Sequence, residues 1–480
     1  MLALIAGLVG IVAVEVNAAP ADFSQDAAKT YVADTSEFKV LTVNRILIIG
    51  NKVTRNRIIS RELSLKPGDT VSVSRLHDLL IKDKNKVYNL RLFNTVSIRF
   101  LELGEGNIDL LVDVNERWYT FPSPIFELSD RNFNEWWQNY NHDFKRVNYG
   151  LRLVQHNFRG RNEQLRLTAQ FGYTRKYELM YSIPNLDQKQ KHGLSFGFDY
   201  GEPKNLAYFT SDHKLDYLEQ KQTLKKTIGG NITYSYRKSF YETHSFQVEY
   251  RNSHIADTIV SLNPNYYTGG STNIQFGAIT YGFVSDHRDV RAYPLKGYEL
   301  DFYISKNGLG FGNVNQLETN LTFAKFIDFG RKMYLSNFTS LYVSSPNSQP
   351  YALYSALGYR KQFIRGYEVY VIEGPKFFLN KTTFKKQIFS KEYHFDAMPM
   401  DQFKHFPVAL YVKGYADVGY VENYSRYSEM KINNTLSNRF LAGAGAGLDL
   451  VLAYDNVIRF EYTFTREHTN GFFFHLKKEF

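Results

Sequence analysis

The feature of this sequence that most constrains its fold is a period of two that recurs through the last three quarters of the chain. Around residues 164–173, 231–236, 246–251, 297–305 and 458–464, apolar side chains alternate with polar or charged ones. Successive side chains of a strand point to opposite faces, so each segment predicts a strand with one apolar face. The opposite face repeatedly carries Arg, Glu, Asp and Gln, which is unusual for a soluble sandwich. A membrane β-barrel explains the pattern, because lipid covers one face and water fills the lumen at the other.

Composition agrees with this interpretation and excludes three other classes of protein. The chain of 480 residues is 16% aromatic and contains no cysteine, yet its mean hydropathy is −0.38. A helical membrane protein would need repeated apolar runs of ~20 residues, and only the N-terminus comes close. A disordered chain would hold fewer aromatic residues, and a disulfide framework requires cysteine.

We count about sixteen strands between residues 118 and 480, which predicts a mainly β chain with a sixteen-stranded antiparallel transmembrane barrel. The longest predicted loops cover residues 129–145, 202–219, 345–372 and 389–407. The predicted strands lie near residues 119–128, 146–156, 163–173, 175–184, 192–201, 220–237, 240–257, 272–285, 297–308, 314–328, 331–344, 373–388, 408–420, 441–452, 456–466 and 471–480.

Residues 1–18 have the pattern of a signal peptide, with an apolar stretch from Leu2 to Val14 and Val16-Asn17-Ala18 before a cleavage site. A signal peptide begins with basic residues, whereas the first one here is Lys29. We therefore expect that the true start lies further upstream; a buried strand or helix is the alternative. The small, polar and acidic residues 19–37 are predicted to form a tether.

Residues 38–117 predict a small α/β domain with the order strand, helix, helix, strand, strand. An apolar strand at residues 46–49 ends at Gly50-Asn51, and two segments of helical period follow. Two alternating segments near residues 96–100 and 108–114 then flank a turn at residues 104–107.

This domain resembles a POTRA domain. The resemblance rests on Gly50-Asn51 after the first strand, on Leu90-Arg91-Leu92-Phe93 before Val96, and on the closing residues 112–116. It implies a periplasmic docking domain whose strand edge accepts a client strand. An unrelated small α/β fold is the alternative.

Three motifs in the barrel region, residues 118–480, together resemble the BamA/TamA superfamily of outer-membrane assembly proteins. They are Phe363-Ile364-Arg365-Gly366-Tyr367 in the long loop, Tyr415-Ala416-Asp417-Val418-Gly419 two strands later, and Asp286, Arg288, Pro294 and Gly297 in an earlier turn. The chain therefore resembles a single-POTRA member of the superfamily over residues 40–480.

The resemblance implies that the long loop folds into the lumen and that Arg365 pairs with Asp417. Such a guanidinium–carboxylate pair is directional and would brace a wide barrel. Gly366 would permit a sharp tip, Tyr367 would pack its ring, and Gly419 belongs to the same strand motif. Relatives often place an acid on the intervening strand, where this sequence has Thr383. The Arg365 network therefore has one anionic partner fewer, unless Glu368 or Glu373 substitutes.

The end of the chain resembles the C-terminal β-signal of outer-membrane proteins. Phe472, Phe474, Leu476 and Phe480 fall on one face of the last strand, with Lys478 as a departure that can reach the barrel rim.

The remaining motifs predict no enzyme, catalytic residue, cofactor or metal site. Gly193 to Gly197 has the spacing of a nucleophile elbow but continues a strand. Gly443, Gly445 and Gly447 mimic a dinucleotide loop without a following helix, so we expect them to keep a strand face small where a loop packs. The net charge of +10 is scattered and matches no nucleic-acid motif, which favours anionic lipid as the partner.

The predicted function is the insertion of outer-membrane proteins or the translocation of polypeptides, from a barrel in the outer membrane with its POTRA domain in the periplasm. Unfolded clients would bind the POTRA edge and the seam between strands 119–128 and 471–480, with accessory lipoproteins as further partners. Pro122 and Pro124 remove hydrogen-bond donors from the first strand, which weakens closure. A dedicated secretion pore, a passive channel and a structural surface-antigen barrel are the alternatives.

Overall fold

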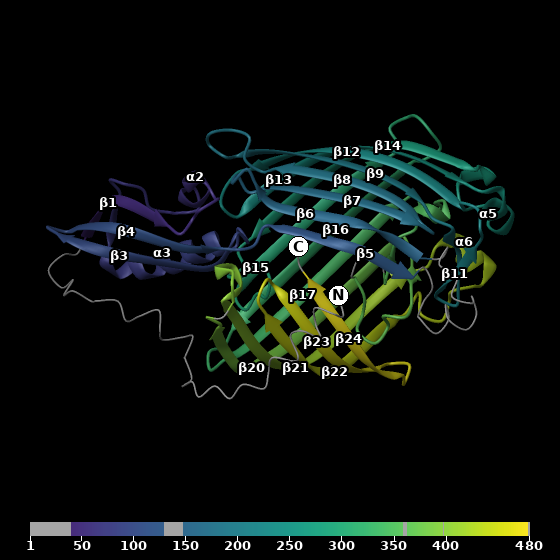
Figure 1. Cartoon of the computed structure of the whole chain (residues 1–480). Coiled ribbons are helices and arrows are strands. Elements are labelled where there is room, and N and C mark those ends of the chain that lie inside the picture. The colour runs from purple at the N-terminus through teal and green to yellow at the C-terminus, as the bar shows by residue number, and fades with distance from the viewer. Residues whose placement is uncertain (1–39, 129–146, 359–361, 397, 479–480) are drawn as a thin grey trace.

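The structure is a computed structural model that describes residues 40–128, 147–358, 362–396 and 398–478. Figure 1 shows a small α/β domain beside one end of a large curved sheet. The predicted signal peptide, the predicted tether and Phe480 lie outside the described residues.

The small domain holds a four-stranded sheet in the order β2-β1-β4-β3, in which β1 runs parallel to β4. Its helices bury Ile58, Ile59 and Val87 against the sheet. The predicted order of elements is confirmed, with one short strand, β2, added between the helices. The elements are β1 (Val40–Ile49), α2 (Asn56–Ser60), β2 (Thr70–Ser72), α3 (Val73–Tyr88), β3 (Phe93–Gly104) and β4 (Asn107–Glu116).

The large sheet confirms the prediction of a mainly β chain, since the described residues form sixteen strands with antiparallel neighbours. Its order follows the chain from β5 to β24. The strands are β5 (Thr120–Leu128), β6 (Val147–Phe158), β7 (Glu163–Gly172), β8 (Arg175–Ile183), β9 (His192–Glu202), β12 (Lys225–Arg237), β13 (Glu242–Ile255), β14 (Asn273–Asp286), β15 (Gly297–Asn307), β16 (Gln316–Asp328), β17 (Met333–Ser345), β20 (Lys376–His394), β21 (His405–Glu422), β22 (Phe440–Leu452), β23 (Asn456–Thr465) and β24 (Asn470–Lys478).

The two faces of this sheet differ as the alternation predicts. On β13, Phe246, Val248 and Tyr250 are exposed on the outer face. On β21, Lys413 and Asp417 are buried on the inner face. Within the described ranges, no helix is both long and apolar enough to cross a membrane.

Two segments predicted as loops contain regular structure instead. Residues 202–219 form a hairpin of β10 (Asn205–Ser211) and β11 (Lys214–Glu219). Residues 389–394 and 405–407 belong to β20 and β21, which continue pairing past a bulge near Ile388. The predicted strand 373–388 ends where this bulge interrupts the period of two. Short elements in other connections are α5 (Asp257–Leu262), η4 (Thr268–Gly270), η5 (Tyr351–Leu353), β18 (Ala356–Leu357), β19 (Ile372–Glu373), η6 (Asp401–Phe403) and α6 (Ser425–Met430).

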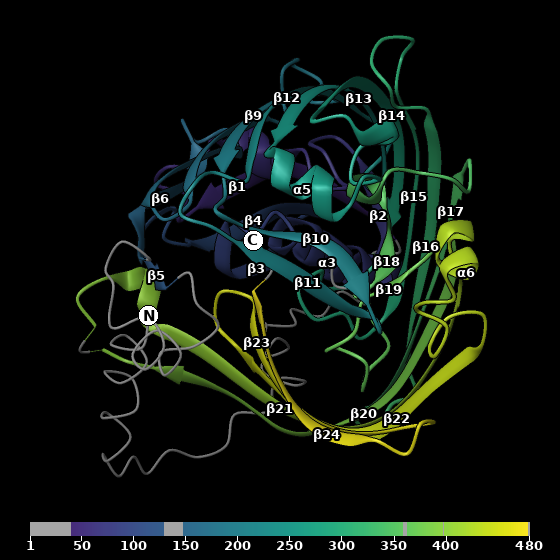
Figure 2. The same cartoon turned by 90° about the vertical axis from the view of Figure 1, so that its right-hand side faces the viewer.

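The hairpin β10–β11 crosses the end of the barrel that faces away from the POTRA domain (Figure 2). Its tip residue His213 is buried: the His213 backbone N–H donates to Asn433 Oδ1 (2.9 Å) and His213 Nε2 accepts from the Leu436 N–H (3.0 Å). A cluster of buried side chains, including Tyr266, Tyr267 and Tyr351, lies at the same end. This end is therefore covered by folded connections.

Candidate functional site

The loop between β17 and β20 returns into the barrel and places Arg365 at its tip. Gly366 has φ of 94°, a left-handed conformation that glycine adopts without strain. A Cβ at this position would lie 2.5 Å from the Thr465 side chain on β23. Both the conformation and the close approach therefore require glycine here.

Arg365 makes a bidentate ion pair with Asp417 of β21. Arg365 Nε lies 2.8 Å from Asp417 Oδ2 and Nη2 lies 2.5 Å from Oδ1, while the Arg365 backbone N–H donates to Oδ2 at 3.1 Å. Both side chains are buried, and the guanidinium lies 3.8 Å from the centroid of the Tyr415 ring. The structure thus brings together the two residues that the family resemblance pairs.

The second acid in contact with Arg365 is Glu461 of β23, and neither Glu368 nor Glu373 substitutes for it. Arg365 Nη1 lies 3.4 Å from Glu461 Oε1, and Nη2 donates to Thr383 Oγ1 (3.0 Å). Glu368 instead accepts the Gly366 N–H, and Glu373 accepts the Tyr427 hydroxyl.

Two glycines make room for the loop. A Cβ on Gly443 of β22 would lie 2.0 Å from the Arg365 carbonyl oxygen, and one on Gly419 of β21 would lie 2.4 Å from Ile364. Tyr367 is buried next to them, and its hydroxyl donates to Glu467. The loop tip is therefore fitted closely against β21, β22 and β23.

The ion pair belongs to a larger lumen ion cluster, which we define as Arg365, Asp417, Glu461, Lys413 and Asp449. Lys413 Nζ lies 2.7 Å from Glu461 Oε1 and 2.5 Å from Asp449 Oδ1. All five side chains are buried. Buried charges are tolerated only when they are paired, as they are here.

A turn at the other end of the lumen extends this cluster to the POTRA domain. Tyr293, in the turn between β14 and β15, donates its hydroxyl to Asp449 (2.8 Å). In the same turn, the Asp289 carbonyl accepts from the side chain of Asn89, and the Arg291 N–H donates to Asn89 Oδ1. Asn89 follows α3, so one turn contacts both the lumen and the POTRA domain.

Residues of the turn motif found in the sequence, among them Asp286, Arg288 and Gly297, fix the conformation of this turn. Arg288 pairs with Asp286 through Nε (2.8 Å) and Nη2 (2.9 Å). Gly297 has φ of 106°, and a Cβ there would lie 2.1 Å from the His287 carbonyl oxygen. Burial raises the pKa of Asp289 in this turn.

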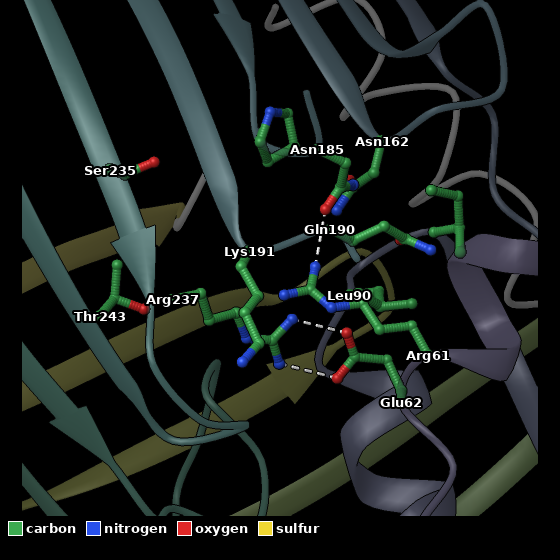
Figure 3. A pocket seen from close by; sticks show the side chains of 12 residues that line it. Arg61, Glu62, Leu90, Asn162, Asn185, Gln190, Lys191, Ser235, Arg237 and Thr243 are labelled. Atoms are coloured by element: carbon green, nitrogen blue, oxygen red, sulfur yellow. Dashed lines mark hydrogen bonds and ion pairs between the residues drawn. The ribbon is translucent and has the colours of Figure 1, made fainter. Parts of the chain in front are cut away.

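A second junction between the POTRA domain and the barrel surrounds a pocket lined by both polar and apolar side chains (Figure 3). Arg237, at the end of β12, forms a bidentate pair with Glu62 at 2.7 and 2.8 Å. Arg61 Nη1 donates to Asn185 Oδ1 (2.6 Å). Burial, together with the charge of Arg237, lowers the pKa of Arg61 to about 10. The direct side-chain contacts of Arg237 with Glu62 and of Arg61 with Asn185 are polar, and they lie beside the apolar side chains of Ile58 and Leu90.

The first and last strands of the sheet are not joined by backbone pairing among the described residues. β5 pairs with β6 and β24 pairs with β23, and no ladder connects β5 to β24. Pro122 and Pro124 lie within β5, as predicted, where each lacks an N–H to donate. The seam is therefore an opening between two strand edges.

The base of the seam is held by side chains. Arg117, just before β5, pairs with Asp455 in the turn between β22 and β23, at 2.8 and 3.2 Å. Tyr454 of the same turn lies edge-on to Phe121, and its hydroxyl accepts the Trp118 N–H. Arg117 and Asp455 are both buried. We call Arg117, Tyr454 and Asp455 the seam clasp.

The predicted β-signal residues lie partly within the described chain. Phe472 and Phe474 of β24 are exposed on the outer face, and Leu476 stands opposite Ile458 in the ladder. Phe480 lies beyond the described residues. Their role as a signal stays a prediction.

Several of these residues were not singled out from the sequence. Alternation places Glu461 on the lumen face, but the register that sets it near Arg365 depends on pairing across β21, β22 and β23. Asp449 and the seam clasp depend equally on contacts between distant segments. In the described part of the chain, no group of His, Asp and Glu side chains is arranged to hold a metal ion.

Comparisons with known proteins give a consistent result. A family model described as the Omp85 superfamily domain matches residues 157–480, and a model described as the surface antigen variable number repeat, a POTRA domain, matches residues 41–117. No curated protein matches the chain.

Solved structures resemble the chain at low sequence identity. CdiB from Escherichia coli has a TM-score of 0.53 at 10% identity, over 91% of this chain and 76% of CdiB. BamA from Haemophilus ducreyi lacking POTRA domains 1–3 has a TM-score of 0.49 at 14% identity, over 91% of this chain and 84% of that one. The likeness to CdiB supports the fold alone.

Proposed function

Because the chain belongs to the Omp85 superfamily, we propose that it inserts β-barrel proteins into the outer membrane. Membership of this superfamily supports the broader activity, insertion or translocation of polypeptides at the outer membrane. The observation that carries the narrower proposal is the seam, where β5 and β24 present strand edges without a shared ladder in the described residues. An unpaired strand edge is a template for another strand.

In this mechanism a client strand pairs with β5 while the seam widens. Backbone hydrogen bonds supply the binding energy of strand addition, so the step needs no nucleotide. The two prolines of β5 leave its ladder incomplete and lower the cost of exchanging one partner for another. The client then leaves sideways into the bilayer.

The POTRA domain, which we assign to residues 38–117 in the periplasm, receives the client first. β3 is an edge strand of the small sheet, and Leu101 and Leu103 near its end are exposed. Such an edge can bind an extended segment by adding it to the sheet. Accessory lipoproteins would act at the same domain.

The lumen ion cluster serves as a brace in this proposal. It ties the loop tip to β21, β22 and β23, which are the strands next to β24. Because β21, β22 and β23 are held rigid, the neighbouring strand β24 forms the fixed side of the seam. The barrel, assigned to residues 118–480, then opens on the β5 side.

Depletion of the protein from its host, followed by quantitative proteomics of the outer membrane, tests the proposal. We expect a general loss of integral β-barrel proteins, with their unfolded forms accumulating in the periplasm. Loss of a single exported protein would instead support a dedicated secretion pore. Conductance of the purified protein in planar bilayers, without any assembly defect on depletion, would support a passive channel. Both of these results contradict insertion as the function.

A further inference from the structure

The strands β20 and β21 extend past their neighbours at the end of the barrel nearest the POTRA domain (Figure 1). The ladder between β17 and β20 ends at Lys386, whereas β20 continues to His394. The ladder between β21 and β22 ends at Val408, whereas β21 begins at His405. We call the two strand segments 386–394 and 405–410 the rim hairpin.

The register of the rim hairpin assigns its two faces. On β21, Val412 and Val418 are exposed outward while Tyr411, Lys413 and Asp417 are buried inward. Continuing this alternation, the outward positions of β21 run without a charged residue from the rim hairpin to the far end. They are Phe406, Val408, Leu410, Val412, Gly414, Ala416, Val418 and Tyr420.

The pairing across the hairpin extends the same outward face onto β20. Phe389 stands opposite Leu410, Lys391 opposite Val408, and Tyr393 opposite Phe406. The opposite face carries Glu392 beside His405 (2.9 Å), together with Pro407 and Ala409. The rim hairpin is therefore amphipathic, with an outward face of aromatic and aliphatic side chains.

This outward face is longer than a bilayer core requires. A tilted spanning strand needs ~9–11 residues, whereas the apolar face of β21 runs from residue 406 to residue 420. The part of this face nearest the POTRA domain must therefore lie at or beyond the boundary between hydrocarbon and headgroups. Aromatic residues are enriched at that boundary in membrane proteins.

Two lysines, Lys386 and Lys391, give this outward face a positive charge. Lys386 is exposed, and Lys391 Nζ lies over the Tyr393 ring at 5.1 Å from its centroid. The only carboxylate described on these two strand segments below Lys386, that of Glu392, is on the opposite face. An aromatic and aliphatic surface with lysines at its lower part is complementary to anionic headgroups.

We propose that the rim hairpin is a lipid-binding surface that lies in the headgroup region of the periplasmic leaflet and holds anionic phospholipid through Lys386 and Lys391. The surface is continuous with the lipid-facing wall, so it requires no partner other than the bilayer. The proposal goes beyond client insertion, and it rests only on the barrel being in a membrane.

Single cysteines test this directly, because the chain contains none of its own. The full chain is reconstituted into phosphatidylethanolamine vesicles with or without phosphatidylglycerol, and carries an environment-sensitive fluorophore at Tyr393→Cys. Ser390→Cys, on the opposite face of the same strand, is the matched control. Val412→Cys reports whether the barrel wall is in the bilayer. Lipids with a nitroxide on the headgroup quench a fluorophore in the headgroup region, as expected at residue 393, and lipids brominated on their acyl chains quench one in the hydrocarbon, as expected at residue 412.

We expect quenching at residues 393 and 412 but not at residue 390, with quenching at residue 393 increased by phosphatidylglycerol. Lys386→Gln and Lys391→Gln should each lower the affinity of the rim hairpin for phosphatidylglycerol, read from the increase in quenching at residue 393, by about fivefold. Lys189→Gln, in the turn between β8 and β9, should leave this affinity unchanged. Quenching at residue 412 with none at residue 393 overturns the lipid surface while leaving the barrel in place. Absence of quenching at residue 412 removes the membrane premise that the proposed function shares.

Discussion

Arg365 is the residue on which the interior of the barrel converges. Its guanidinium contacts Asp417, Glu461, Thr383 and the Tyr415 ring at once. The planar fork of arginine satisfies two carboxylates and a hydroxyl in a way that the single ammonium of lysine cannot. The same side chain therefore ties the loop to three strands.

Arg365→Ala should leave Asp417 buried without its cation and loosen the loop from the wall. Breaking a buried pair costs ~3–5 kcal/mol, and water in the lumen lowers that figure. We expect a folded but less heat-resistant barrel with reduced activity, measured by the temperature at which its mobility in detergent gels changes. Arg152→Ala, an exposed arginine of β6, is the control. Wild-type heat resistance and activity in the Arg365→Ala protein would exclude the brace.

A methyl group tests the fit of the loop without changing charge. Gly443→Ala would place its Cβ 2.0 Å from the Arg365 carbonyl oxygen, while Gly414→Ala on β21 meets its nearest neighbour at 4.0 Å. Overpacking of this kind costs about 1–3 kcal/mol. Gly443→Ala should lower heat resistance and Gly414→Ala should not. Equal behaviour of the two variants would mean that the loop does not pack there.

The sequence predicts part of this site because the motifs around Arg365 and Asp417 are local, and family resemblance pairs them. It also predicts that the glycines of β22 face a packed loop, which Gly443 does. Glu461 could not be assigned, because alternation gives its face but not its distance from a loop tip that is remote in sequence. Glu368, which the sequence left open as a substitute partner, accepts the Gly366 N–H instead.

At the scale of elements, the hairpin β10–β11 is closed onto the barrel mouth by contacts at its tip. His213 is neutral there, because its Nε2 accepts the Leu436 N–H and burial lowers its pKa to about 4. Asp212 is the charged neighbour that partly offsets this effect. Asn433 Nδ2 donates to the Thr210 carbonyl and completes the contact.

Acid should release this hairpin. The docked form has a lowered pKa, whereas an undocked histidine titrates at ~6.5, so the undocked form binds protons more readily. Docking is therefore independent of pH above ~6.5 and weakens as the pH falls from there toward 4. A fluorophore at Ser211→Cys should lose anisotropy over that range. In the His213→Gln variant the anisotropy should not fall over this pH range. A fall with the same midpoint as in the protein that retains His213 would show that His213 is not the responsible group.

Most strands could be predicted from the sequence because alternation persists over their whole length. The hairpin β10–β11 could not, since its strands are short and lie inside a connection between spanning strands. The extension of β20 and β21 was missed for a different reason. The bulge near Ile388 breaks the period of two, although pairing continues to His394.

For the whole molecule, the contacts form one connected path. The POTRA domain holds the turn between β14 and β15 through Asn89, that turn holds Asp449 through Tyr293, and Asp449 joins the lumen ion cluster. The seam clasp ties the start of β5 to the turn between β22 and β23. Together these contacts fix the wall around the seam except along β5 and β24 themselves.

The central claim is that the seam between β5 and β24 opens, and a reversible crosslink tests it most directly. One cysteine is placed in β5 and one in β24, and insertion of a client barrel into vesicles is measured before and after crosslinking. A crosslink between β12 and β13 at Tyr234 and Phe246, which face each other in a continuous ladder, is the control. If the seam opens, the seam crosslink abolishes insertion, reduction restores it, and the control crosslink has no effect. Full activity with the seam crosslinked would contradict this claim.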